Sequence, residues 1–371
     1  MSDRPIKIAD IIAAIEHAAP RALQEDYDNS GLQLGDAGCE CSGVMLSVDV
    51  TPAVVEEAIR TGCNFILSHH PLLFKGLKRI AGRTEVEKSV ALAIKHDITV
   101  YAAHTSLDNA RNGVSACMAE MLGLVNSRPL VPVEGKMLKL ATYVPVSHVE
   151  VVRKAMFSAG AGHIGDYDSC SFNIEGKGTF RALQGADPFV GRIGEIHTEP
   201  ETRIEVIVPA WLADGVERAL ISAHPYEEPA YEFLQMANPC RSIGCGAIGE
   251  LEAEMMPVEF VELVKATFGT PVARCNEAVN SSRPIKRIAL CGGSGGSFIG
   301  AALAQGADAY ITSDTRYHDF IDYGTQLLIV DIGHQESESC TKQIFFRIIT
   351  EKFPNFAVRY AHTDRNPINY V

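Results

Sequence analysis

No run of about 18 apolar residues occurs in the 371-residue sequence, so no membrane-spanning helix is predicted. The N-terminal segment MSDRPIKIADIIAAIEHAAP also lacks a long apolar core, and it is interpreted as a helix rather than a secretory signal. Positive charge is not in excess, because the formal net charge is -13. A general surface for nucleic acid or anionic membrane is therefore disfavoured, since phosphate groups would be repelled.

Cysteines with zinc-ribbon spacing are lacking as well. Of the ten cysteines, only the pairs Cys39/Cys41 and Cys240/Cys245 lie close in sequence, and neither pair has the spacing of a structural zinc site. The thiols are predicted to be free, which is typical of a reducing cytoplasm. A metal site must therefore be sought among histidine, aspartate and glutamate.

The first part of the sequence alternates between strand-like and helix-like patterns. Residues 43–50, 63–70 and 98–108 are apolar and rich in β-branched residues, which predicts strands. Residues 51–62 and 85–97 have helical spacing of apolar residues. This rhythm predicts an α/β fold in which parallel strands are joined by crossover helices.

The middle part has a different pattern. Two strand-then-helix units, KLATYVPVSHVEVVRKAMFSAG and RIEVIVPAWLADGVERALISAH, are interleaved with short segments rich in Gly and Pro. This arrangement predicts a small α+β domain of ferredoxin-like type over residues 130–237.

The last part resumes the first pattern. An amphipathic helix is predicted over residues 257–269, a strand, Gly-rich turn, helix and strand over 286–314, and a strand, polar loop and long helix over 325–350. One α/β domain with a parallel-rich sheet, made of residues 1–129 and 238–371, is thus predicted to be interrupted by the smaller domain.

Polar residues gather where three apolar strands end. FILSHHPLL, VYAAHTSLD and LLIVDIGHQESE each place potential metal ligands after a strand. In open parallel sheets such groups meet at the carboxyl edge. The candidate ligands are His69, His70, His104, Asp108, His334 and Glu338.

The ligand types and their spacing favour two metal ions. His69 and His70 are adjacent, so on a strand their rings point in opposite directions and suit two neighbouring ions better than one. His334 and Glu338 share one face if a helix begins there. Asp108 or Glu338 can bridge two ions, since a carboxylate has two oxygens. Imidazoles with carboxylates suit zinc, iron, manganese or nickel better than magnesium or calcium.

Two glycine-rich segments carry weaker signals. GCGAIG (244–249) fits the pattern of a dinucleotide-binding loop but does not precede a convincing helix, so a turn or strand is predicted. GGSGGS (292–297) lies between a strand and a helix, where it forms either a tight turn or an anion-binding loop.

Two polar segments and one serine leave alternatives open. SDTRYHDF (313–320) either places Asp314, Tyr317 and His318 at the mouth of the same site or has a packing role. HPYEEPAYEF (224–233) is interpreted as domain surface rather than a second active site. Ser68 beside His69 does not establish a Ser-His-Asp triad.

The motifs SHHPLLFKGLK, AAHTSLD, SDTRYHD and GHQESE resemble those of the Nif-three-like dinuclear-metal proteins, which are also named GTP cyclohydrolase type 2 homologues. DYDNSGLQLGD (26–36) resembles the N-terminal signature of that family, and the resemblance covers the whole chain. The inserted stretch is similar to the PII-like or CutA-like insert of the longer members. The chain departs from the usual pattern at Ser313-Asp314-Thr315-Arg316 and at Gln335-Glu336-Ser337.

The resemblance implies a toroidal homohexamer whose metal ions face an interior cavity. It also implies that His69 and His70 bind different ions, that Asp108 binds the first ion and His334 the second, and that Glu338 bridges both. His104 lies beside the site as a candidate ligand or proton carrier.

The leading functional prediction is metal-dependent hydrolysis by a cytoplasmic protein. Two divalent ions would hold and activate a water molecule, with His104 or His318 carrying a proton. The family label suggests GTP or another nucleotide as the small-molecule substrate, with hydrolytic opening of the purine ring. The alternative is a non-catalytic metal-binding scaffold or regulator whose insert senses a ligand. A nucleic-acid role ranks third because of the acidic charge balance.

Overall fold

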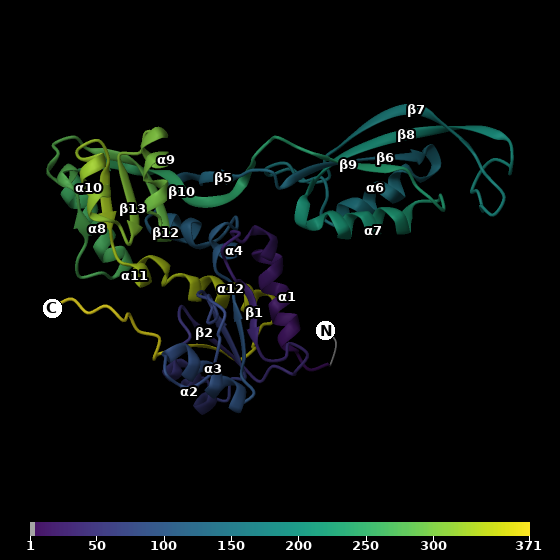
Figure 1. Cartoon of the computed structure of the whole chain (residues 1–371). Helices are drawn as coiled ribbons and strands as arrows, with labels where there is room; N and C mark the ends of the chain where they lie inside the picture. Colours follow the sequence, from purple (N-terminus) through teal and green to yellow (C-terminus); the bar gives the residue numbers. More distant parts are fainter. Residues whose placement is uncertain (1–3) are drawn as a thin grey trace. The chain divides into compact units, whose positions relative to one another are not determined.

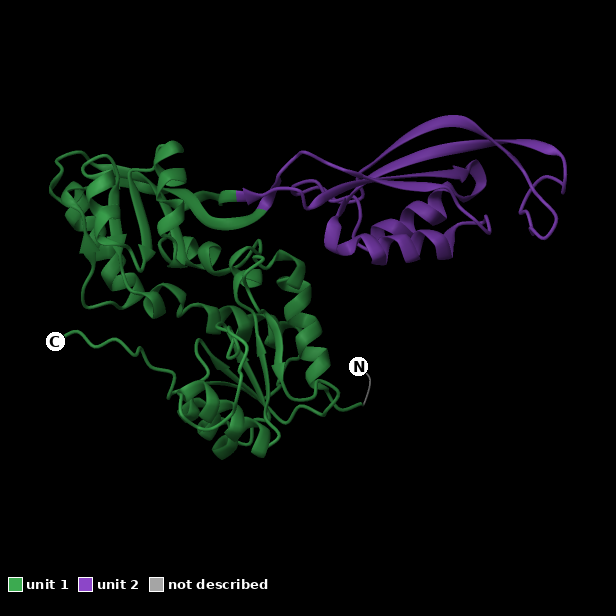
Figure 2. Ribbon diagram, viewed as in Figure 1, with its two compact units in different colours: residues 1–131, 243–371 green, residues 132–242 purple. Residues whose placement is uncertain are grey.

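The computed structural model describes residues 4–371 of the chain. Two compact units are present: one is formed by residues 1–131 and 243–371, and the other by residues 132–242 (Figure 2). The second unit is therefore an insertion in the sequence of the first. The sequence patterns placed the two divisions after residues 129 and 237. Among the described residues, no helix is both long and apolar enough to cross a membrane.

The first unit contains two sheets (Figure 1), and the first sheet has five strands in the order β1-β4-β3-β2-β15. Four of the strands run parallel to their neighbours, and β1 is antiparallel to β4 at one edge. The strands are β1 (Gly31–Leu34), β2 (Val44–Ser47), β3 (Phe65–Ser68), β4 (Thr99–Ala102) and β15 (Val358–Tyr360). The helices along this part of the chain are α1 (Ile8–Ala18), α2 (Pro52–Thr61), α3 (Glu85–Lys95), α4 (Thr105–Asp108) and α5 (Val114–Met121).

Helices cover both faces of this first sheet. Phe65 and Leu67 of β3 pack in one core cluster with residues of α1, while Ile66 packs in another cluster with residues of α2 and α3. Successive side chains of a strand point to opposite faces, so β3 must be apolar at every position. This burial explains why its sequence FILS reads as a continuous apolar run rather than an alternating one.

The second sheet of the first unit has six strands in the order β11-β14-β13-β12-β10-β5. Here β12, β13 and β14 are parallel, whereas β10 and β11 pair antiparallel with β12 and β14. The strands are β5 (Val125–Val133), β10 (Cys240–Met255), β11 (Arg274–Cys275), β12 (Ile285–Ser294), β13 (Ala309–Ser313) and β14 (Leu328–Asp331). The helices are α8 (Pro257–Phe268), α9 (Ile299–Ala304), α10 (Tyr317–Tyr323), α11 (His334–Glu338) and α12 (Thr341–Lys352).

The predicted α/β fold with parallel-rich pairing is confirmed, but the strands divide between two sheets instead of forming one. A shared core joins the sheets, because Phe65 of the first sheet and Ile311 of the second belong to one buried cluster. The N-terminal helix is also confirmed as α1, and GCGAIG lies inside β10. The long C-terminal helix is preceded by the short helix α11 where a polar loop was expected.

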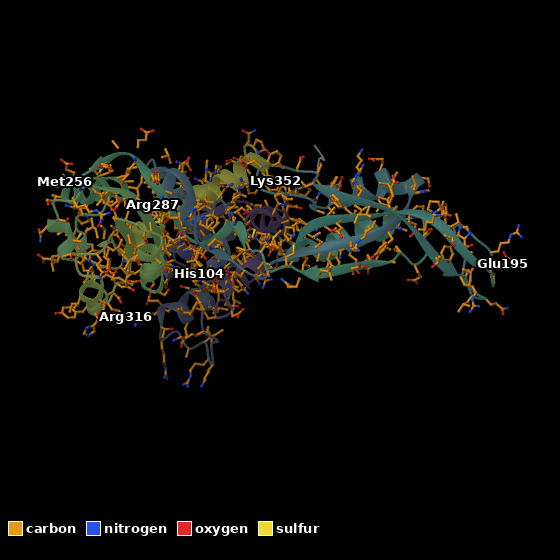
Figure 3. All side chains as sticks on the ribbon, turned by 90° about the horizontal axis from the view of Figure 1, so that it is seen from above. His104, Glu195, Met256, Arg287, Arg316 and Lys352 are labelled. Atoms are coloured by element: carbon orange, nitrogen blue, oxygen red, sulfur yellow. The ribbon has the colours of Figure 1, made fainter. Side chains whose placement is uncertain are left out.

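The second unit has a four-stranded antiparallel sheet in the order β7-β8-β6-β9. Its strands are β6 (Met137–Pro145), β7 (Ser171–Arg181), β8 (Ile196–Pro209) and β9 (Tyr231–Gln235), and its helices are α6 (Val149–Ser158) and α7 (Ala213–Ala223). The order βαββαβ is that of a ferredoxin-like domain, as predicted. The two helices cover one face of the sheet through a buried apolar cluster. Glu195 lies at the far end of the segment that joins β7 to β8 (Figure 3).

Candidate metal centre

Residues from both sheets of the first unit meet in one cluster. His69 and His70 directly follow β3, and His104 precedes α4 just after the neighbouring strand β4. Glu338 ends α11, which follows β14 of the second sheet. Side chains that were predicted to gather at the carboxyl edge of one sheet therefore gather between two sheets.

Glu338 lies at the middle of this cluster. Its Oε1 atom lies 3.5 Å from His69 Nε2, while its Oε2 atom lies 2.9 Å from His70 Nε2 and 3.1 Å from His334 Nε2. Asp108 Oδ1 lies 3.7 Å from His69 Nε2. The two carboxylate oxygens of Glu338 therefore face different imidazoles.

His104 belongs to the same group of side chains. Its ring centroid lies 5.2 Å from that of His69 and 5.5 Å from that of His70. One potential ligand atom from each of these three histidines lies within 4.8 Å of the others. The same limit holds for His70, His334 and Glu338, so both sets can hold a metal ion.

Each of the four histidines has an oxygen acceptor beside its Nδ1 atom. His69 Nδ1 lies 3.0 Å from the carbonyl oxygen of Ala103. The Nδ1 atoms of His70, His104 and His334 lie 2.9, 2.8 and 2.5 Å from the carboxylates of Asp49, Asp28 and Asp314, respectively. A carbonyl or an ionised carboxylate only accepts, so Nδ1 carries the proton in each ring. In the neutral form of the ring, which is the form that binds metal ions, Nε2 then carries a lone pair.

The lone pairs of these rings point toward one another. His70 Nε2 and His334 Nε2 are only 3.2 Å apart. Within residues 4–371, the buried atoms His69 Nε2 and Asp108 Oδ1 have no hydrogen-bond partner. Burying unpaired polar atoms and converging lone pairs is unfavourable unless a cation satisfies them. The donor set therefore fits a bound metal ion.

The electrostatics of the cluster favour positive charge. Burial lowers the pKa of His70, but the carboxylates of Asp49 and Glu338 outweigh it and raise the pKa to about 10. Burial also opposes the charge on His334, yet Glu338 and Asp314 raise its pKa to about 9. Although burial disfavours its ionised form, the imidazoles hold the pKa of Glu338 well below its ordinary value. A cation at this position is thus stabilised by the surrounding carboxylates.

Sequence comparison identifies the family. The model of the family described as Duf34/NIF3 (NGG1p interacting factor 3) matches residues 6–367. The chain therefore belongs to the Duf34/NIF3 family. Two relatives of this NIF3-family chain are named GTP cyclohydrolase 1 type 2 homolog. The protein from Halalkalibacterium halodurans is 40% identical, with 87% of each chain covered, and the protein from Bacillus subtilis is 36% identical, with 97% of this chain and 98% of the relative covered.

The same NIF3 fold is found in a solved structure. The crystal structure of a Bacillus cereus protein related to NIF3 matches with a TM-score of 0.88 and 37% sequence identity, and the match covers 100% of both chains. The resemblance to the Nif-three-like family is thus confirmed. The relation of the inserted unit to PII or CutA proteins stays a prediction.

The Gly-rich segment GGSGGS of this NIF3-family chain forms a structural turn beside the cluster. The backbone N–H of Gly293 donates to Ser337 Oγ at 2.9 Å, and that of Gly295 donates to Thr312 Oγ1 at 2.9 Å. Because these two amides are already bonded within the protein, the segment is a tight turn rather than an open anion-binding loop.

The segment SDTRYHDF contributes one residue to the cluster and leaves two outside it. Asp314 holds His334 in place and adopts a left-handed backbone conformation, with φ of 54°. Tyr317 and His318 are exposed on α10, with ring centroids 5.5 Å apart, and no contact described for residues 4–371 joins either to the cluster. Ser68 donates to the carbonyl oxygen of His70 at 2.8 Å, which is a structural role.

Asp28 and Asp49 were missed as functional residues by the sequence analysis. Asp49 lies two residues after β2, at the same carboxyl edge as His69 and His70, so its place after an apolar strand was a usable signal. Asp28 accepts hydrogen bonds from the hydroxyl groups of Thr105 and Ser30 at 2.5 and 2.7 Å. Burial opposes the ionisation of Asp28, but His104 and these bonds hold its pKa well below the ordinary value.

Proposed function

We propose that this protein binds two divalent metal ions and hydrolyses a nucleotide or a related small molecule. The observation that carries the proposal is the position of Glu338, whose two oxygens face His69 on one side and His70 with His334 on the other. A carboxylate in this position suits a bridge between two ions. His69 and Asp108 would then hold one ion, and His70 and His334 the other.

The chemistry of the donors limits the metals. Neutral imidazoles with carboxylates suit zinc, iron, manganese or nickel. Two such ions lower the pKa of a water molecule to about 7 and stabilise negative charge that develops on the substrate. The hydrogen bonds from Nδ1 of each ring fix the ligands before a metal binds.

His104 is the residue assigned to proton transfer in this proposal. Its Nδ1–H donates to Asp28 at 2.8 Å, so its Nε2 atom is free to accept a proton beside the cluster. Asp28 holds the ring in one orientation. His318, the other predicted proton carrier, is exposed on α10 and receives no role here.

The resemblance to family members suggests an assembly, a compartment and a substrate for this activity. A toroidal homohexamer in the cytoplasm, with GTP or another nucleotide as the substrate, belongs to the same proposal. The ten free cysteines are in keeping with a reducing compartment. Sedimentation of the purified protein tests the assembly, since a six-chain particle is expected.

The test combines metal analysis with a hydrolysis screen. We expect about two ions per chain, and turnover of at least one substrate among GTP, other nucleotides and phosphoesters. Glu338→Gln should lose both metal and turnover. Glu336→Gln, on the same helix, should keep both, because Glu336 Oε1 accepts from Asn366 instead of facing the histidines. A protein that takes up no metal after reloading would refute the proposal.

A second function, that of a metal-binding scaffold or regulator with a ligand-sensing insert, is supported by a cavity in the second unit. Two ions without turnover of any substrate would favour this second function.

A further inference from the structure

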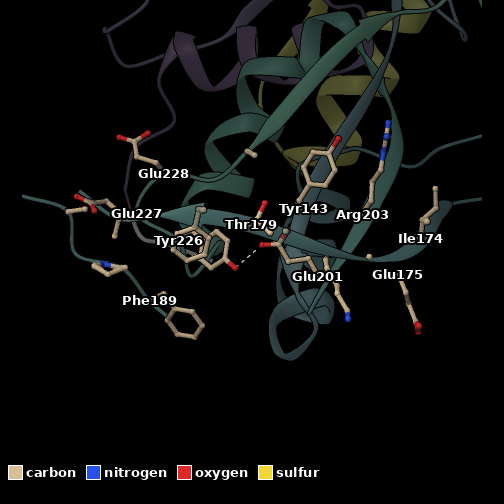
Figure 4. A pocket seen from close by; sticks show the side chains of 18 residues that line it. Tyr143, Ile174, Glu175, Thr179, Phe189, Glu201, Arg203, Tyr226, Glu227 and Glu228 are labelled. Carbon is tan, nitrogen blue, oxygen red and sulfur yellow. Dashed lines mark hydrogen bonds between the residues drawn. The ribbon is translucent and has the colours of Figure 1, made fainter. Parts of the chain in front are cut away.

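The inserted unit contains a cavity of about 640 Å³ that lies entirely within residues 132–242 (Figure 4). Its lining comes from β6, from β7 and β8, from the loop that follows β7, and from the segment 224–230 that leads into β9. The segment HPYEEPAYEF, which was predicted to be plain domain surface, therefore forms part of its wall. A cavity of this size is large enough for a small organic ligand.

Two loops meet to close this cavity. The backbone N–H of Asp187 donates to Glu227 Oε2 at 2.9 Å. The ring of Phe189 lies 6.3 Å from that of Tyr226, and Phe180 of β7 lies 5.9 Å from the same tyrosine ring. Three aromatic side chains thus form one wall. Aromatic faces carry negative electrostatic potential and attract cations as well as planar apolar groups.

A nearly buried carboxylate faces the same space. Glu201 of β8 is 9% exposed, and its Oε1 atom accepts a hydrogen bond from Tyr226 Oη at 2.8 Å, as Figure 4 shows. Within residues 4–371, no basic side chain forms an ion pair with Glu201. Arg203, two residues on, pairs with Glu205 at 3.0 Å instead. The carboxylate therefore keeps acceptor capacity that a donor or a cation entering the cavity can use.

The neighbouring strand β7 leaves room for the carboxylate of Glu201. A Cβ atom at Gly178 of β7 would lie 2.2 Å from Glu201 Oε2, so this glycine makes space for the acid. A Cβ atom at Gly176 would meet no atom within 4 Å, so the cavity extends over that position. The charged lining residues are predominantly acidic: Glu175, Glu201, Glu227, Glu228, Lys177 and Arg203.

We propose that this cavity binds a small organic cation, with its ammonium group at Glu201 and its apolar body against Phe180, Phe189 and Tyr226. The four acidic lining residues outnumber the two basic ones and so disfavour anions, and the aromatic wall offers contact area to an apolar ligand body. This assignment is independent of the metal centre, because all of its residues belong to the second unit.

The test measures binding of three isosteric probes to the full-length protein by ligand-observed NMR titration at pH 7. Benzylamine is the cationic probe, benzyl alcohol the neutral one and benzoate the anionic one. We expect millimolar binding of benzylamine, at least about tenfold weaker binding of benzyl alcohol, and no binding of benzoate.

Three variants assign the binding to this cavity. Glu201→Gln should weaken benzylamine binding about tenfold or more, because it removes the charge and keeps the shape. Gly176→Leu should abolish it by filling the open space, and it leaves Glu201 unchanged. Glu195→Gln is the matched control, because Glu195 is exposed and does not line the cavity. Benzylamine binding that is absent in the wild type, equal to that of benzyl alcohol, or unchanged in both cavity variants would overturn the proposal. If a second copy of the chain fills the cavity, benzylamine will not bind to the wild type.

Discussion

Gly293 leaves the space that the carboxylate of Glu338 occupies. A Cβ atom at residue 293 would lie 2.2 Å from Glu338 Oε1, and the glycine has a φ of 64°. The end of β12 therefore lacks a side chain where the central carboxylate of the cluster packs. The sequence GGSGGS, for which a tight turn and an anion-binding loop were both open, makes room for an anionic side chain of the protein itself.

Gly293→Ala should displace Glu338 and weaken metal binding. The methyl group would push Oε1 away from His69, and the left-handed backbone adds about 1 kcal/mol of strain. We expect metal content to fall well below that of the wild type in elemental analysis, together with a lower unfolding midpoint. Gly296→Ala is the control in the same turn, since the nearest atom to its Cβ is 3.6 Å away. Equal metal content in the two variants would contradict this role of Gly293.

The sequence was sufficient to predict which candidate ligands come together but not what surrounds them. His69, His70, Asp108, His334 and Glu338 each follow an apolar strand, and the structure brings them together. The partner of His104 could not be found in this way, because Asp28 is 76 residues distant and precedes the strand β1. Such pairs depend on which strands become neighbours, which a local pattern does not encode.

The division of the strands into two sheets could not be predicted for the same reason. Strands β3 and β14 are both buried on two faces, so their sequences FILS and LIVD are equally apolar. Such an apolar run does not determine which strand it pairs with, since backbone hydrogen bonds are independent of side-chain identity. The ferredoxin-like order of the second unit was easier to predict, because its strands and helices follow one another in sequence in the order βαββαβ that defines such a domain.

Asp49 should control the metal affinity of His70. Its Oδ1 atom lies 2.9 Å from His70 Nδ1 and keeps the proton on that nitrogen. Asp49→Asn weakens this acceptor, so we expect metal affinity to fall by about 10- to 100-fold, as for other groups that orient a histidine ligand. Competition with a fluorescent chelator measures the change. Glu56→Gln, an exposed acid on α2, should leave the affinity unchanged. Wild-type affinity in the Asp49→Asn variant would show that Asp49 has no influence on the ligand.

Glu57 should give the first unit a pH-dependent stability. Its carboxylate accepts hydrogen bonds from the Thr363 hydroxyl at 2.7 Å and from the backbone N–H groups of Thr363 and His362 at 2.9 and 3.2 Å, which attach the C-terminal segment to α2. Burial opposes ionisation, but these bonds lower the pKa of Glu57 below the ordinary value of 4.5. A lowered pKa means that the folded state binds this proton less readily than the unfolded state. The stabilising contribution of the Glu57 carboxylate is therefore present at neutral pH. It is lost as the pH falls below the ordinary pKa of 4.5 and through the lower pKa of the folded state.

Glu57→Gln should lower the free energy of unfolding by about 1–3 kcal/mol at pH 7. The difference from the wild type should shrink in acid, because the unfolded wild-type chain then gains stability by binding a proton at Glu57, which the folded state resists. Urea denaturation at pH 7 and at pH 4 measures both values. Glu56→Gln on the exposed side of the same helix should cause little change at either pH. A difference that stays constant between the two pH values would mean that ionisation of Glu57 does not stabilise the fold.

Metal removal should destabilise the first unit and leave the second unit unchanged. The ligands come from both sheets of the first unit, so an ion bound among them holds the sheets together, whereas no residue of 132–242 belongs to the cluster. At a free metal concentration about 100 times the dissociation constant, binding adds about 2.7 kcal/mol to stability. Hydrogen exchange with and without a chelator should therefore show faster exchange after β3 and in α11, with the same rates in α6 and α7. The chelator should have no effect on Glu338→Gln, and faster exchange in that variant would mean that the metal stabilises the fold from a different site.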